Sequence, residues 1–109
     1  MRKNKVKPQV ELNKLENTVV NAKTIEEFDN LMKISELVGW KWESGYSPRQ
    51  GNLVSERWEA YKERICVCIS NGELSYGPKN TYKKTLSFQQ FCDMNNLTQE
   101  KLNDLINKN

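Results

Sequence analysis

The chain has 109 residues, a formal net charge of +3 and no histidine. A chain of this length folds as one domain, and the absence of histidine removes the commonest general base and the commonest metal ligand. No run of apolar residues is long enough for a membrane span or a secretion signal, so we expect a cytoplasmic protein.

Residues 1–17 predict a basic, flexible N-terminal arm. Four basic side chains precede the first acidic one and leave the rest of the chain near neutrality: Arg2, Lys3, Lys5 and Lys7. Such an arm can contact phosphate, although a solvated terminus is its simpler interpretation. The folded part is expected to be a single domain over residues 18–109.

A short strand and a long helix are the first elements expected in this domain. Val19 and Val20 favour a strand over residues 18–21. Thr24 is a suitable N-cap for a helix that Gly39 ends. Between these caps, apolar side chains recur at helical spacing: Ile25, Phe28, Leu31, Met32 and Leu37. This helix is therefore expected to pack on one face of a sheet.

The next segment predicts a strand, a loop and a short helix. Residues 40–46 alternate as in a strand, with Trp40 and Trp42 on the same side. Glycine, proline and serine make residues 47–52 a loop. Ser55 is the expected N-cap of the short helix that follows.

A β-hairpin is the clearest local feature in the second half of the chain. Residues 65–69 alternate between branched apolar side chains and the two cysteines of this stretch. Asn71 and Gly72 both tolerate a positive φ, which a tight hairpin turn requires. The returning strand is expected to end at Gly77 and Pro78.

The C-terminal segment predicts a last short strand and two short helices. Thr85 and Leu86 favour the strand, Ser87 and Gln90 form a capping box, and Thr98 caps the final helix. These elements predict an α+β fold: an antiparallel sheet of three to five strands, one long helix packed on a face, and two short C-terminal helices.

The three cysteines are Cys66, Cys68 and Cys92. An odd number without a secretion signal favours free thiols in a reducing compartment. A structural zinc site needs four ligands, so we expect no metal and no cofactor. Cys66 and Cys68 are expected to pack as small, partly apolar residues beneath a helix.

Aromatic and basic residues intermingle in the middle of the chain, and no catalytic motif accompanies them. Aromatic faces with cations suit single-stranded nucleic acid, a nucleotide or a protein hot spot. With a nucleotide, a tryptophan would stack on the base while a loop cation meets phosphate. The candidate binding residues are Trp40, Trp42, Arg49, Arg57, Trp58, Lys62, Tyr76, Lys79, Tyr82 and Lys83.

Two stretches resemble a group of short proteins from Gram-positive phages and prophages: TIEEFDNLMKISELVGWKWESGYSP and WEAYKERICVCISNGELSYGPKNTY. The shared pattern is a capped helix ending in glycine, a W-x-S/E-G strand, and a hairpin whose N-G or D-G turn precedes L-x-Y-G. It covers residues 18–91. Small phage proteins often inhibit host defence, and they include anti-CRISPR proteins and sponges for nucleotide signals. The resemblance implies a phage accessory protein in the cytoplasm of an infected bacterium, and it identifies no site residues.

These observations lead to two hypotheses about function. The first is a non-catalytic, anti-CRISPR-like inhibitor that binds a host defence nuclease complex, since one face of a small domain supplies the roughly 800 Å² that an interface needs. A nearly neutral body favours direct blocking over mimicry of DNA. The alternative is a nucleotide-sequestering or single-stranded nucleic-acid-binding protein. The protein is expected to be a monomer or a homodimer.

Overall fold

A computed structural model of the protein describes residues 18–107. The predicted N-terminal arm lies outside the described residues. The elements are β1 (Thr18–Asn21), α1 (Ile25–Val38), β2 (Lys41–Trp42), α2 (Leu53–Tyr61), β3 (Ile65–Ser70), β4 (Glu73–Pro78), β5 (Leu86–Ser87), α3 (Phe88–Met94) and α4 (Gln99–Asn107), with single 3-10 turns at Lys62–Arg64 and Lys79–Thr81.

The five strands form one sheet in the order β2-β4-β3-β1-β5. β3 lies antiparallel to both β4 and β1, whereas β2 runs parallel to β4 and β5 runs parallel to β1. The α+β class is confirmed, but the purely antiparallel sheet was wrong because the sheet is mixed. Parallel neighbours are joined by long connections, and the alternation within one strand does not show which distant strand it will meet.

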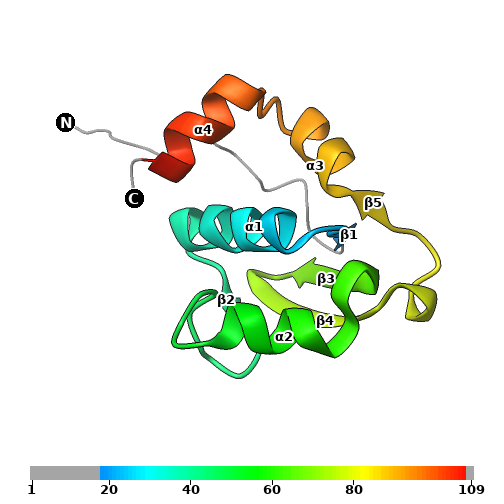
Figure 1. The fold of residues 1–109 in the computed structure, drawn as a ribbon. Coiled ribbons are helices and arrows are strands. Elements are labelled where there is room, and N and C mark those ends of the chain that lie inside the picture. The colour runs from blue at the N-terminus through cyan, green and yellow to red at the C-terminus, as the bar shows by residue number, and fades with distance from the viewer. Residues whose placement is uncertain (1–17, 108–109) are drawn as a thin grey trace.

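The helix α1 has the caps that the sequence predicts. The Thr24 hydroxyl accepts a hydrogen bond from the Glu27 amide at 3.0 Å, and Gly39 ends the helix at φ 89°. Figure 1 shows α1 crossing the middle of the molecule, with α2 on one side and α3 and α4 on the other. Phe28 on α1 is fully buried, as predicted.

Strand alternation divides the sheet into a face covered by helices and an opposite face. Val67 pairs with both Val20 and Tyr76, so these three side chains share the face on which α1 and α2 pack. Cys66 and Cys68 point to the opposite face, which corrects their expected place beneath a helix. The core on the helix face is contiguous and includes Val20, Phe28, Leu31, Met32, Ile34, Trp42, Ile65, Val67, Ile69, Leu74 and Phe91.

The hairpin is formed as predicted. Asn71 and Gly72 both have positive φ, 54° and 77°, and they connect β3 to β4 so that Ile69 pairs with Leu74. Two positive φ values in succession are the signature of the tight turn whose twist matches that of the strands. β3 of this hairpin is the central strand of the sheet, and β4 lies next to it.

Two expected elements differ in their bounds. The strand predicted over residues 40–46 is reduced to β2, because the chain turns back after Trp42. The Trp42 amide donates to the Tyr46 carbonyl at 2.9 Å, and the Gly45 amide donates to the Trp42 carbonyl at 2.7 Å. Ser55 lies inside α2 rather than capping it, since the helix begins at Leu53 after Asn52.

The C-terminal segment packs on α1 and β1. Ser87 and Gln90 form the predicted capping box, and the Thr98 hydroxyl accepts from the Lys101 amide at 3.1 Å. Phe91 is fully buried. Among residues 18–107, the helices lack the length and apolarity needed to cross a membrane.

Cys92 makes the domain less stable as the pH rises into the alkaline range. The side chain is 3% exposed, and burial, the largest cause, raises the pKa of its thiol from 9.0 to about 11. Above pH 9 the unfolded chain loses this proton while the folded protein keeps it. The free energy of unfolding therefore falls by about 2–3 kcal/mol between pH 9 and 11.

Urea unfolding of the protein and of Cys92→Ala at a series of pH values measures this effect. The variant should lose less stability than the parent over the same interval, although burial also raises the pKa of the Cys66 thiol. If the free energy of unfolding falls equally steeply with pH in the two proteins, the loss of stability does not come from Cys92.

Candidate functional site

The candidate site is an arginine held by two aromatic rings at one end of the sheet. Arg57 extends from α2, and its Cζ lies 4.5 Å from the ring centroid of Trp42 and 4.6 Å from that of Tyr76. The two rings meet edge to face, with centroids 5.6 Å apart. β2 and β4 place them together, because Trp42 pairs with Leu74 two residues before Tyr76.

Arg57 has no polar partner within the described part of the chain. Its Nε is buried without a hydrogen bond, and the ion pairs between residues 18 and 107 involve other cations. A buried donor without a partner costs free energy comparable to that of a broken hydrogen bond. The site therefore holds a half-buried arginine whose Nε has no acceptor among residues 18–107 and whose guanidinium lines the cleft described next.

A cleft of about 210 Å³ opens beside this guanidinium. Its walls come from the end of β2, the turn that follows it, α2 and β4: Trp42, Glu43, Ser44, Arg57, Leu74, Ser75 and Tyr76. The volume is smaller than the 300–1,000 Å³ of most small-molecule sites. The cleft thus suits a single side chain better than a whole nucleotide.

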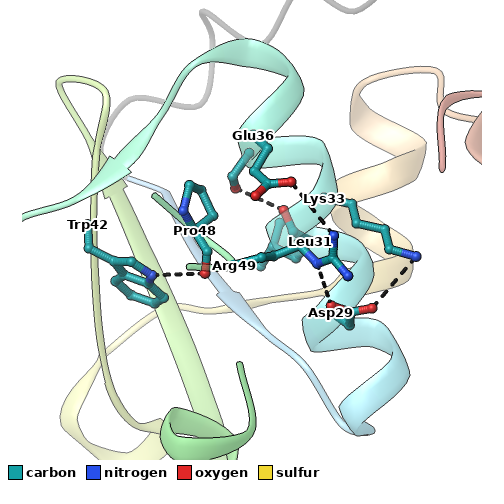
Figure 2. Close-up of polar contacts among 8 residues, drawn as sticks. Asp29, Leu31, Lys33, Glu36, Trp42, Pro48 and Arg49 are labelled. Carbon is teal, nitrogen blue, oxygen red and sulfur yellow. Dashed lines mark hydrogen bonds and ion pairs between the residues drawn. The ribbon is translucent and has the colours of Figure 1, made fainter. Parts of the chain in front are cut away.

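Arg49 and Trp42 fasten the loop after β2 to the body of the domain (Figure 2). Arg49 Nε donates to Asp29 Oδ1 at 2.9 Å and its Nη1 lies 3.8 Å from Glu36 Oε1. Trp42 Nε1 donates to the Pro48 carbonyl at 3.2 Å. Arg49 is therefore already paired with carboxylates of α1, and the buried Trp42 ring does not face solvent for stacking on a base.

Comparison of the chain with protein-family models, curated proteins and solved structures finds no match. The site is accordingly interpreted from its geometry.

Three further candidate residues lie away from this cleft. Trp58 packs on the core with its ring centroid 6.4 Å from that of Phe28. Trp40 lies beside the hairpin turn, 3.8 Å from the position a Gly72 side chain would take. Lys62 follows α2 and pairs with Glu59 at 2.9 Å. These positions give Trp58 and Trp40 packing roles and leave Lys62 on the surface.

The loop after β4 brings a second group of candidates to the opposite face of the sheet. Tyr82 folds back against that face, so that a methyl group on Gly77 would lie 3.0 Å from its hydroxyl oxygen, and Lys79 and Lys83 are exposed in the same loop. Burial raises the pKa of the Tyr82 hydroxyl. The candidate residues therefore divide between two faces and do not form one surface.

A larger groove lies between α1 and the C-terminal helices, with a volume of about 630 Å³. Its charged lining consists of Glu26, Glu27 and Asp93. Three carboxylates repel the phosphates of a nucleotide. A third hollow, of about 700 Å³, is lined by Thr98 and by residues of α4 alone.

Sequence reasoning identified Trp42, Arg57 and Tyr76 as candidates without associating them with one another. It missed Glu43 and Ser44, which line the same cleft. The alternation of aromatic residues on strands was the available signal for Trp42 and Tyr76. The position of α2 above Trp42 and Tyr76 depends on the path of the chain from β2 to β3. No short sequence pattern predicts this path.

Proposed function

We propose that the protein is a phage accessory protein that inhibits a host defence nuclease complex by binding to it, without catalysis. The observation that carries this proposal is the Arg57 guanidinium, which lies against the rings of Trp42 and Tyr76 beside a cleft and whose Nε has no hydrogen bond within the described residues. Arginine, tryptophan and tyrosine are the residue types that dominate the binding energy of protein interfaces.

Size and charge favour a protein partner over a nucleotide. The cleft at Arg57 measures about 210 Å³, which is smaller than most small-molecule sites. The larger groove near α1 is lined by carboxylates. Arg49, which a phosphate would need, already contacts Asp29 and Glu36.

The class of partner comes from the resemblance to short phage proteins. The motifs behind it, a glycine-terminated helix and an N-G hairpin followed by L-x-Y-G, fall within α1, β3 and β4. The chain also contains no histidine, which supports inhibition by occupancy rather than by turnover.

Replacing Arg57 with alanine is expected to abolish inhibition. A hot-spot arginine contributes about 2 kcal/mol or more to binding, so the affinity for the partner should fall by about thirtyfold or more. The measurement is the plating efficiency of a phage on bacteria that carry one nuclease-based defence system and express the protein. Expression of the parent should restore plating, and expression of Arg57→Ala should not.

Lys101→Gln supplies the matched control, because it removes one positive charge from the exposed surface of α4. It should inhibit as well as the parent, and thermal unfolding should show all three proteins folded. Equal activity of Arg57→Ala and the parent would remove the basis of the proposal. A large thermal shift with a nucleotide would favour the sponge hypothesis, since a ligand at 100 times its Kd stabilises by about 2.7 kcal/mol.

Deleting residues 1–8 is expected to change binding little. This segment carries four positive charges, which could neutralise up to four phosphates of a nucleic-acid partner. Binding titrations at two salt concentrations, with and without the segment, measure the difference. A nucleic-acid target predicts that the slope of log K against log salt falls by about 0.7–0.9 for each phosphate that the shortened protein no longer neutralises, whereas a protein surface predicts nearly equal slopes.

A further inference from the structure

The outer edge of β4 has a strand partner along only part of its length. β4 has six residues, and β2, its neighbour on that side, pairs with Glu73 and Leu74 alone. After Trp42 the chain leaves the sheet in a turn that places Gly45 at φ 95°. Within residues 18–107, the edge of β4 from Ser75 onward therefore has no strand beside it on this side.

The first backbone N–H and C=O groups that face this vacant edge beyond the end of β2 belong to Tyr76. The Glu43 amide donates to the Leu74 carbonyl at 2.9 Å, and the Lys41 amide donates to the Gly72 carbonyl at 3.2 Å. Residues two apart on a strand direct their N–H and C=O groups to the same side. The amide and carbonyl of Tyr76 thus point to the outer edge, just past the end of β2, while Ser75 and Gly77 face β3.

The cleft beside Arg57 coincides with this vacant stretch of edge. It is lined by Leu74, Ser75 and Tyr76 from β4, and by Trp42 and Ser44 where β2 ends. The Tyr76 side chain lies on the helix face, since Tyr76 pairs with Val67. A residue placed opposite Tyr76 would therefore direct its side chain to the same face, toward Arg57.

The positive charge of Arg57 at the cleft favours an acidic side chain on the partner residue opposite Tyr76. The Arg57 Cζ lies over the rings of both Trp42 and Tyr76, and the guanidinium lines the cleft without an ion pair among residues 18–107. A carboxylate accepts two parallel hydrogen bonds from an arginine. Glu43 lines the cleft but lies beyond ion-pair distance of Arg57 in the described structure, so the cation is not already neutralised.

We propose that the partner supplies an extended peptide segment that adds to the sheet along β4 at Tyr76, with an aspartate or glutamate opposite Tyr76 seated against Arg57. This inference rests on the proposed function, since it specifies how the partner is bound. Main-chain hydrogen bonds to a strand edge give such binding its affinity, and the pocket for the alternate side chain gives its specificity.

The test begins with selection from a random octapeptide library on the full-length protein. The selected peptides should share one acidic position. Changing that residue to its amide, or Arg57 to glutamine, should weaken binding by about tenfold or more. Methylating the peptide backbone nitrogen that faces the Tyr76 carbonyl should weaken it similarly, because the methyl group removes the main-chain hydrogen bond. Selection of no peptide above background, or of peptides without an acidic position, would overturn the proposal.

Hydrogen exchange at the Tyr76 amide separates strand addition from other binding at Arg57. In the free protein this amide should exchange faster than those of Ser75 and Gly77, and the peptide should slow it by about tenfold or more. Peptides that need Arg57 but leave Tyr76 unprotected would refute strand addition while preserving the proposed function. Inorganic phosphate is the control for simple anion binding. If phosphate displaces the peptide and changes the NMR chemical shifts of the Arg57 side chain alone, the site is a simple anion site and strand addition is refuted. Failure of the parent protein to restore phage plating, by contrast, counts against the proposed function itself.

Discussion

Phe28→Ala is expected to destabilise the domain by about 3–5 kcal/mol, which is enough to leave much of the protein unfolded. Phe28 is fully buried, lies near Trp58 of α2 and belongs to the core that joins α1 to the sheet. Truncation would remove the ring and leave a cavity among Leu31, Met32 and the strands. Urea unfolding followed by circular dichroism measures the loss of stability.

Ile25→Ala is the matched control for this substitution. Ile25 lies on the same helix, also carries a large apolar side chain, and is 42% exposed. Its truncation should cost less than about 1 kcal/mol. Similar losses of stability at Phe28 and Ile25 would mean that α1 does not present the Phe28 side to the sheet.

Trp42→Ala is the second substitution with a large expected effect, again about 3–5 kcal/mol. The side chain is 3% exposed, its indole nitrogen bonds to the Pro48 carbonyl, and its ring supports Arg57. Its removal opens the core at the end of β2 and frees the loop after it. Thermal and urea unfolding should both detect the change.

Two variants separate the contributions of the ring and of the indole nitrogen. Trp42→Phe keeps an aromatic ring and removes the bond to Pro48, so we expect the free energy of unfolding to fall by about 1–3 kcal/mol. Tyr46→Ala alters an exposed aromatic in the same turn and should cost less than about 1 kcal/mol. A Trp42→Ala protein as stable as Tyr46→Ala would contradict the buried position of the indole.

Local signals in the sequence were sufficient for the elements whose structure is determined locally. The caps at Thr24 and Gly39 and the Asn71-Gly72 turn formed as predicted because each depends on neighbouring residues. The prediction of a strand over residues 40–46 was wrong because the end of that strand depends on contacts with residues further along the chain. Alternation continued past Trp42, but the hydrogen bonds of the turn to Tyr46 ended the strand.

The candidate site shows the same division between local and distant causes. Residue type alone selected Arg57, Trp42 and Tyr76, and also Arg49, which pairs with Asp29 on another element. Whether a cation is paired or unpaired depends on which elements pack together. The parallel pairing of β2 with β4, and the packing of α2 above both, decide that the Nε of Arg57 has no acceptor among residues 18–107.

The position of β1 inside the sheet has a consequence for the synthesis of the protein. Asn21 at the end of β1 donates a hydrogen bond to the Ile65 carbonyl, 44 residues later, so β1 and α1 leave the ribosome well before β3 can pair with them. At about 5–20 residues per second this delay is roughly 2–9 s. During that time Val20, Phe28 and Leu31 have no sheet to pack on, and the nascent chain should bind chaperones until the hairpin emerges. Chains stalled on the ribosome before and after β4 should differ in protease resistance of the α1 segment, and equal resistance would show that α1 folds without the hairpin.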